Sequence, residues 1–415
     1  MKRLYTSGGS GYIQADRVNQ KLLHLMSSET HTKRILILGQ TPPPFHGQAM
    51  MTQRLLEANL EGVELYHVRL NFSKSIGSIG KFSFYKILHL IEVIAKSIYL
   101  RFRHNISVLY FMPVGNSKVP LIRDILILST LRILFPKTYF HFRAAGISLF
   151  VKKQTGLIGK LAHWVYRNPD VSIQLAARNP EDGAYFGSKK VLVIPNGLED
   201  AAFSYLPIRK PGLGPTEILF VGVVRESKGI LILLEAAKQL QEKGLEFKVN
   251  IMGGFESPKF EKICQVFVKT FELEQKVEFL DVKINQEKWN YFRRSHILCF
   301  PSFFESESFG NVVLEAMMFE MPVVGSNWRG IPEIIADGKT GLVVPTKDAA
   351  ATANALQKLI ENPVLRVKMG KAGRDRFIKY YRLPTFIHRM DTVFKENPDP
   401  ALIKESEKVS LPQHF

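Results

Sequence analysis

Two glutamates with seven residues between them, Glu307 and Glu315, bracket the most chemically informative segment of this 415-residue chain. Between them, Gly310 permits a tight turn, Asn311 is a favourable N-cap, and apolar residues recur behind it at helical spacing. A helix is therefore expected over residues 311–319, and its free N–H groups and dipole favour an anion such as phosphate. Carboxylates would repel that phosphate, whereas they accept hydrogen bonds from sugar hydroxyls. The spacing thus indicates a sugar-nucleotide pocket; the alternative is a dipole-favoured acid at Glu307 and a solvated acid at Glu315.

A second group of polar residues follows the apolar run at residues 217–222. Arg225 and Lys228 stand between the strand-end Gly222 and a helical pattern that begins at Gly229. Turns of this kind lie at the carboxyl edge of a parallel sheet, where open α/β sheets bind their ligands. We therefore expect both cations to reach the same sheet edge as the two acids, the alternative being a solvated turn.

The whole chain alternates short apolar runs with helical patterns, which is typical of parallel α/β units. The expected strands are residues 34–39, 63–68, 107–112, 138–142, 171–175 and 191–194, and then 217–222, 247–254, 276–280, 296–302, 322–326 and 341–345. Three prolines and two glycines make residues 206–217 the best linker. The sequence predicts two doubly wound, Rossmann-like domains, residues 33–205 and 206–380. An N-terminal extension, residues 1–32, precedes them, and a crossover helix and tail, residues 381–415, follow.

These motifs together resemble a retaining glycosyltransferase of family 4, which has the GT-B architecture of two Rossmann-like domains facing across a cleft. The resemblance rests on the Glu-x7-Glu pair, the Lys-Gly at 228–229, IPNG at 194–197 and RGIPEIIADGKTGLVVP at 329–345. It extends from about residue 34 to residue 381. It implies retaining transfer of a sugar from a nucleotide-sugar donor to a lipid-linked or polysaccharide acceptor in cell-surface glycan biosynthesis.

The resemblance also implies roles for individual residues. Glu315 matches the family's ribose-binding acid, and Glu307 matches the acid that faces the donor sugar. Lys228 matches the lysine on the donor diphosphate. The remaining matches are the phosphate cradle of Phe309, Gly310 and Asn311, Gly47 in the N-terminal glycine loop, the strand-end His141, and Glu333 in the Gly-Gly-x-x-Glu turn. Glu307, Lys228 and His141 are the catalytic candidates, and the others, with Arg225, are donor-binding candidates.

Three positions depart from the family pattern. Val223 stands where an arginine normally follows the strand-end glycine, so Arg225 is the candidate to replace that arginine. His46-Gly47 replaces the usual Gly-Gly, and Arg329 replaces a glycine. His141 has a purely structural alternative. His163, His296 and His388 have no support from the family pattern.

No metal or further cofactor is expected. The chain shows no HExxH, no Asp-x-Asp-like pair in a suitable loop and no Cys/His cluster, and its two cysteines, Cys264 and Cys299, lie in apolar runs. The resemblance implies that arginine, lysine and a helix N-terminus neutralise the departing diphosphate instead.

The charge distribution points to an anionic partner. The net charge is +18, and residues 74–160 contain 14 basic residues but only two acids, Glu92 and Asp124. Residues 81–103 form a basic amphipathic pattern whose apolar stripe, Ile87, Ile91, Ile94 and Ile98, is expected to cover the sheet. Since every apolar run is interrupted by charge before about 18 residues, we expect a cytoplasmic protein that docks peripherally on an anionic membrane.

Two other functions fit parts of the pattern. A nucleotide-sugar epimerase would share the fold, and a nucleic-acid-binding protein would explain the pI of about 9.7. Because neither a helix-turn-helix nor an aromatic strand platform is evident, no nucleic-acid partner is expected.

Overall fold

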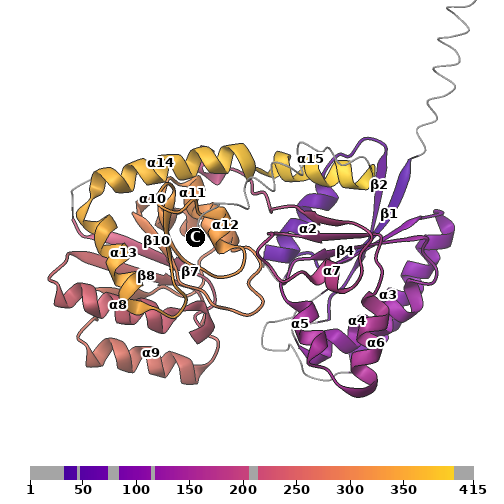
Figure 1. Ribbon diagram of the computed structural model, residues 1–415, viewed down its shortest axis with the longest axis horizontal. Helices are drawn as coiled ribbons and strands as arrows, with labels where there is room; N and C mark the ends of the chain where they lie inside the picture. Colours follow the sequence, from indigo (N-terminus) through magenta and orange to yellow (C-terminus); the bar gives the residue numbers. More distant parts are fainter. Residues whose placement is uncertain (1–31, 44–46, 73–83, 114–116, 205–213, 397–415) are drawn as a thin grey trace, which may run out of the picture.

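The computed structural model describes residues 32–43, 47–72, 84–113, 117–204 and 214–396, which fold into two α/β domains (Figure 1). The predicted extension up to residue 31, the tail from residue 397, Lys74 and His46 lie outside these described residues, as do residues 206–213 of the predicted linker.

The first sheet has six parallel strands in the order β2-β1-β3-β4-β5-β6. Their bounds are β1 (Lys33–Gly39), β2 (Val63–Arg69), β3 (Val108–Phe111), β4 (Lys137–Phe142), β5 (Val171–Gln174) and β6 (Val191–Val193). The helices between them are α2 (Gly47–Glu57), α3 (Phe84–Arg103), α4 (Lys118–Leu131), α5 (Ile147–Lys152), α6 (Gly156–Tyr166) and α7 (Asp182–Tyr185). Every residue of β3 is buried, because helices cover both faces of the sheet.

The second sheet repeats this design in the order β12-β11-β10-β7-β8-β9. Its strands are β7 (Thr216–Val221), β8 (Phe247–Met252), β9 (Val277–Phe279), β10 (Ile297–Phe300), β11 (Val323–Ser326) and β12 (Gly341–Val344). Its helices are α8 (Ile230–Glu242), α9 (Pro258–Thr270), α10 (Asn285–Arg294), α11 (Asn311–Met318), α12 (Ile331–Ile334), α13 (Ala349–Glu361) and α14 (Pro363–Tyr380). The predicted fold class, two parallel doubly wound domains, is confirmed.

The strand order fixes where ligands bind. The chain runs outward from β7 through β8 to β9, then returns to place β10 on the other side of β7. The loops that follow β7 and β10 therefore diverge at a topological switch point, which is where open α/β sheets form a crevice. Those two loops carry Lys228 and Glu307.

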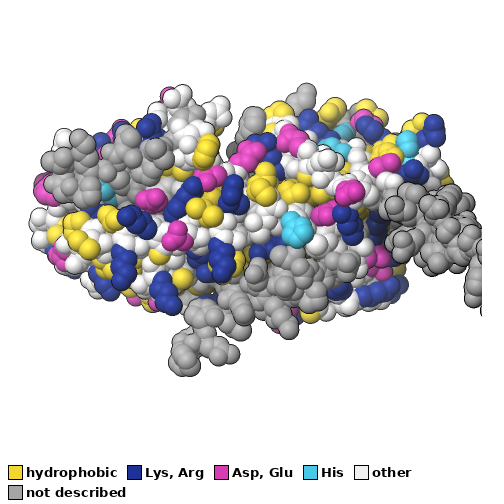
Figure 2. All heavy atoms as spheres, turned by 90° about the horizontal axis from the view of Figure 1, so that it is seen from above, with side chains coloured by type: hydrophobic (Ala, Val, Ile, Leu, Met, Phe, Trp, Pro, Cys, Tyr) yellow, Lys and Arg dark blue, Asp and Glu magenta, His cyan; other side chains and the backbone are white. Residues whose placement is uncertain are grey.

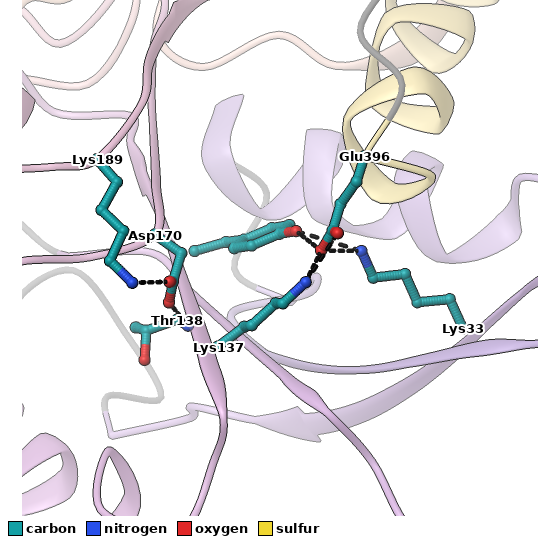
Figure 3. A network of polar contacts seen from close by, with 7 residues as sticks. Lys33, Lys137, Thr138, Asp170, Lys189 and Glu396 are labelled. Atoms are coloured by element: carbon teal, nitrogen blue, oxygen red, sulfur yellow. Dashed lines mark hydrogen bonds and ion pairs between the residues drawn. The ribbon is translucent and has the colours of Figure 1, made fainter.

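The last helix, α15 (Leu383–Phe394), crosses back onto the first domain (Figure 1). Phe386, Met390 and Phe394 join the buried cluster between α2 and the first sheet. Just beyond the helix, the Glu396 carboxylate accepts hydrogen bonds from Lys33 Nζ at 2.5 Å, Lys137 Nζ at 2.6 Å and Tyr139 Oη at 2.8 Å (Figure 3). Burial disfavours the charged carboxylate, but these hydrogen bonds outweigh it and lower the pKa of Glu396 to about 2.

The orientation of α3 differs from the prediction. Its innermost residues are Val93 and Ser97, while Ile87 and Ile91 of the predicted core stripe are exposed. Ile94 and Ile98 are half-buried against the sheet-facing cluster. A stripe of spacing 4-3-4 defines one helix face but not which face meets the sheet, and here the packing rotates the helix away from that stripe.

Candidate active site

The turn from β10 into α11 forms one wall of the site. Gly310 has the left-handed backbone angle φ of 86° and is the N-cap, so helix α11 begins at Asn311. This corrects the predicted N-cap by one residue: Asn311 is the first helical residue, and its side-chain Oδ1 accepts a hydrogen bond from Asn196 Nδ2 at 2.8 Å. Val313 N–H donates to Gly310 O at 2.9 Å, but an N-cap glycine provides no side-chain acceptor that would compete with an anion for the N–H groups of Asn311 and Val312.

Lys228 and Glu307 meet across the switch point. Lys228 ends a short 3-10 helix, Glu226–Lys228, and its Nζ lies 2.5 Å from Glu307 Oε2. The two side chains are only 16% and 11% exposed. The ammonium also lies 5.1 Å from the centre of the Phe304 ring, and Ser302 Oγ donates to the same carboxylate oxygen at 3.3 Å. This is a pre-positioned pair of opposite charges, facing a cavity.

That cavity, of about 340 Å³, lies between the two domains. The second domain contributes Gly222, Lys228, Phe300 and residues 306–312, and the first domain contributes Gly47, Gln48, Arg143, Leu175 and Asn196. Six predicted site residues thus come together: Glu307, Lys228, Phe309, Gly310, Asn311 and Gly47. A Cβ on Gly47 would lie 3.2 Å from Asn311 Nδ2, so this glycine allows the first domain to approach the start of α11 closely.

Arg225 and Glu315 do not line this cavity. Arg225 forms an ion pair with Glu256, and its guanidinium lies 4.9 Å from the centre of the Phe304 ring. Glu315 lies one turn along α11 and pairs with Lys288 Nζ on α10 at 2.6 Å. Its side chain is half-buried rather than solvated, which excludes the solvated alternative for this acid.

Glu333, predicted to contact the donor, joins the two domains in this structure. It is 4% exposed, and its carboxylate accepts hydrogen bonds from the backbone N–H groups of Ala177, at 3.0 Å, and Arg178. Burial raises the pKa of Glu333, although these two N–H donors act in the opposite direction. Its oxygens therefore accept hydrogen bonds from the loop after β5, and its role in donor binding stays a prediction.

Arg329, the cation that replaces a family glycine, also lies at the domain boundary. Its Nη2 donates to Glu305 O at 3.2 Å, and the same group lies 3.3 Å from where a Cβ on Gly146 would be. Burial lowers the pKa of Arg329, while the nearby Asp182 opposes that shift.

His141 is fully buried in β4 and does not line the cavity. Its Nδ1 shares a hydrogen bond with Tyr110 Oη, and its Nε2 has no partner among the described residues. Burial lowers the pKa of His141 well below its usual value, so the ring is neutral at pH 7. This geometry matches the structural alternative more closely than the predicted catalytic contact.

Three polar first-domain residues of the cavity were missed by sequence reasoning: Gln48, Arg143 and Asn196. Asn196 belongs to the IPNG motif, and Arg143 directly follows β4, at the sheet edge where open α/β sheets bind ligands. Its position just after a strand therefore offered a signal for Arg143. The direction of Gln48 depends on how α2 packs, which no local pattern encodes.

The described residues offer neither a cluster of metal ligands nor a membrane-spanning helix. They contain no group of three His, Cys, Asp or Glu side chains arranged to hold a metal ion. None of the helices seen in the described ranges is long and apolar enough to cross a bilayer.

The chain is similar in sequence to known glycosyltransferases. Residues 208–376 match the family described as "Glycosyl transferases group 1", and the resemblance to family 4 glycosyltransferases is confirmed for this part of the chain. Among curated relatives, the putative colanic acid biosynthesis glycosyltransferase WcaL of Salmonella typhimurium is 28% identical over 245 residues, covering 52% of this chain and 59% of the relative. The D-inositol 3-phosphate glycosyltransferase of Pseudarthrobacter chlorophenolicus is 30% identical over 225 residues, covering 51% and 53%. The chain thus spans about half the length of the curated relatives it matches.

Solved structures match over both domains. Sucrose-phosphate synthase from Thermosynechococcus elongatus has a TM-score of 0.69 at 17% identity, covering 88% of this chain and 98% of that one. Anabaena HepE in complex with UDP-glucose has a TM-score of 0.64 at 14% identity, covering 88% and 99%. At these identities the likeness shows the fold, which is GT-B.

Proposed function

We propose that this protein is a metal-independent, retaining glycosyltransferase that moves a sugar from a nucleotide-sugar donor to an acceptor. The observation that carries the proposal is the Lys228–Glu307 pair in an inter-domain cavity at the N-terminus of α11. One group is suited to a phosphate and the other to sugar hydroxyls, and the backbone N–H groups of the helix add a second anion contact. The family match over residues 208–376 and the UDP-glucose complex of a neighbour with the same fold support this assignment.

The proposed roles follow from where charge develops. As the glycosidic bond to the nucleoside diphosphate breaks, negative charge grows on the leaving phosphate oxygen, and Lys228 with the start of α11 stabilises it. Glu307 then binds the donor sugar once Lys228 turns to the phosphate. Glu315 is proposed to bind the ribose. Its carboxylate must then either accept hydrogen bonds from Lys288 and the ribose together or break the ion pair with Lys288. The family resemblance implies front-face attack guided by the leaving phosphate, which retains the anomeric configuration.

A donor panel tests the proposal. UDP-, GDP- and ADP-sugars are incubated with the purified chain, and released nucleoside diphosphate, epimerised donor and random-sequence DNA binding are measured in parallel. We expect slow donor hydrolysis that Glu307→Gln reduces by more than tenfold, while Glu305→Gln, an exposed acid two residues away, leaves it unchanged. Epimerised donor without hydrolysis would favour the epimerase, and salt-sensitive DNA binding without hydrolysis would favour a nucleic-acid function.

We further propose that the acceptor is a lipid-linked or surface-polysaccharide precursor, approached from an anionic membrane. The colanic acid enzyme among the relatives supports the polysaccharide class. Helices α3, α4 and α6 pack side by side over one face of the first sheet, and their outer surfaces combine large apolar side chains with lysines and arginines. The exposed apolar residues are Tyr85, Ile87, Leu88, Ile91, Tyr99 and Phe102 on α3, Val119, Ile122 and Leu126 on α4, and Leu157, Ile158 and Trp164 on α6. By contrast, basic and acidic side chains are interspersed over the face that carries α14 and α15 (Figure 2).

Vesicle sedimentation tests this docking surface. Lys96 and Arg103 are exposed on α3, the helix that also exposes the apolar residues Leu88 and Ile91. Each basic residue near an anionic surface contributes about 1 kcal/mol, so Lys96→Glu/Arg103→Glu should weaken binding to phosphatidylglycerol vesicles by at least tenfold. Leu88→Ser/Ile91→Ser should weaken binding even at high salt. Equal binding to neutral and anionic vesicles, or wild-type binding by both variants, would contradict the proposal.

A further inference from the structure

Arg143 is a buried cation in the wall of the inter-domain cavity. It directly follows β4 and is 7% exposed, yet it lines the same cavity as Lys228 and Glu307. It comes from the first domain, whereas Lys228 and the start of α11 come from the second.

Part of the Arg143 guanidinium has no partner. Nη1 donates to Asn196 Oδ1 at 2.9 Å, but Nε and Nη2 are buried without a hydrogen-bond partner in the described ranges of the chain. Burial lowers the pKa of Arg143, and the neighbouring Tyr110 opposes that shift. Gln48 Nε2, in the same cavity, is a second buried donor without a described partner.

A buried charge is costly unless an opposite charge or several hydrogen bonds compensate it. Arginine remains protonated in proteins, so this site cannot relieve the cost by losing its proton. Nε and Nη2 belong to one planar guanidinium at the cavity wall, and a guanidinium can donate two parallel hydrogen bonds to phosphate oxygens. The missing partner is therefore expected to be an anion that enters the cavity as a ligand.

A chain of hydrogen bonds positions this cation beside the helix N-terminus. Arg143 donates to Asn196 Oδ1, and Asn196 Nδ2 donates to Asn311 Oδ1 at 2.8 Å. Two further hydrogen bonds join the loop before α11 to the first domain. Ser308 Oγ donates to Arg143 O at 2.5 Å, and Asn179 Nδ2 donates to Ser308 O at 2.8 Å. The guanidinium and the first turn of α11 therefore face one space across the domain boundary.

Among its described residues, the second domain brings few cations to this cavity. Val223 occupies the position after the strand-end glycine, and Arg225 is held by Glu256 outside the cavity. Lys228 is the second-domain cation that lines the cavity, and Glu307 neutralises it. A donor diphosphate carries more negative charge than Lys228 offsets alone.

We propose that Arg143 is a donor-binding residue that supplies the second cation for the diphosphate from the first domain. The assignment rests on the proposed function, since it deepens the same site. It makes the diphosphate a bridge between the domains, with Arg143 on one side and Lys228 and α11 on the other.

Calorimetry on the full chain tests the assignment. A thermal-shift screen of UDP, GDP and ADP selects the nucleoside diphosphate that binds the wild type, and that diphosphate, its nucleoside and inorganic pyrophosphate are then titrated into each variant. Arg143→Met should weaken the diphosphate and pyrophosphate by about 10- to 100-fold, the effect of hydrogen bonds to a charged group, and leave the nucleoside unchanged. Arg389→Met is the matched control: its guanidinium is equally buried, at 3% exposure, but does not line the cavity, so diphosphate affinity should stay at the wild-type value.

If Arg143→Met does not fold, Arg143→Lys preserves the charge without the planar fork and should weaken the diphosphate by about 3- to 10-fold with unchanged nucleoside binding. A folded Arg143 variant with wild-type diphosphate affinity would overturn the assignment and leave the proposed function intact. The same holds if Arg225→Met, and not Arg143→Met, removes that affinity. A wild type that binds none of the three diphosphates would overturn both.

Discussion

The Lys228–Glu307 pair predicts two separable effects of replacing Lys228 with methionine. The first concerns turnover, because Lys228 is the donor placed at the oxygen where charge develops. Removing one pre-positioned donor of this type lowers kcat by about 10²- to 10³-fold, which corresponds to about 2.7–4 kcal/mol. We expect a loss in this range for Lys228→Met.

The second effect concerns stability. In the intact pair the Glu307 side chain is 11% exposed, and after loss of Lys228 its carboxylate would keep Ser302 Oγ, at 3.3 Å, as a partner. Exposed pairs contribute less than about 1 kcal/mol, and breaking fully buried pairs costs about 3–5 kcal/mol. For this largely buried pair with one remaining donor we expect about 1–2 kcal/mol, a fall in Tm of about 2–8 °C for a domain of this size.

A double-variant cycle separates the two effects. Lys228→Met/Glu307→Gln should recover much of the lost Tm, since no unpaired charge remains, but should recover no activity. Lys238→Met, a partly exposed lysine that pairs with Glu235 on α8, is the control for removing an ion-paired lysine. Donor hydrolysis under single-turnover conditions and thermal unfolding are measured on the wild type, the two single variants, the double variant and the Lys238→Met control. A folded Lys228→Met variant with kcat within threefold of wild type would refute the reasoning.

The remaining predictions concern the rest of the chain. Glu315→Ala should weaken nucleoside diphosphate binding by about tenfold, and an unchanged Kd by calorimetry would exclude the ribose contact. EDTA should leave donor hydrolysis unchanged, whereas recovery by Mn²⁺ of activity lost to EDTA would contradict metal independence. Glu396→Gln should lower the unfolding free energy by about 1 kcal/mol at pH 7, given that the carboxylate is 40% exposed. Because the pKa of Glu396 is depressed to about 2, the difference in Tm between variant and wild type should shrink as the pH falls below about 4.5, and a constant difference down to pH 3 would show that the carboxylate charge does not stabilise α15.

Much of the architecture was readable from local patterns. Parallel strands buried on both faces appear as continuous apolar runs, and every strand and helix named from the sequence is present with its ends shifted by at most three residues. The convergence of Lys228, Glu307 and Gly310 also follows from local information. Each residue comes shortly after a strand, and neighbouring parallel strands end at the same sheet edge.

The tertiary structure decided which charged side chains form ion pairs with one another. Arg225 and Lys228 come from the same turn, yet one pairs with Glu256 and the other with Glu307. No spacing rule distinguishes these outcomes, because each depends on how a second loop, 31 or 79 residues away, packs against the turn.

The contacts between the two domains could not be predicted from the sequence either. The carboxylate of Glu333 binds a loop about 155 residues earlier in the chain, and Asn311 meets Asn196 rather than capping its own helix. The sequence by itself determined the elements, the turn and the residue types at the switch point, since these depend on local propensity and hydrophobic periodicity. The burial of His141, the rotation of α3 and the position of Arg143 were decided by long-range packing, which sets the desolvation of each polar group and is a property of the folded chain alone.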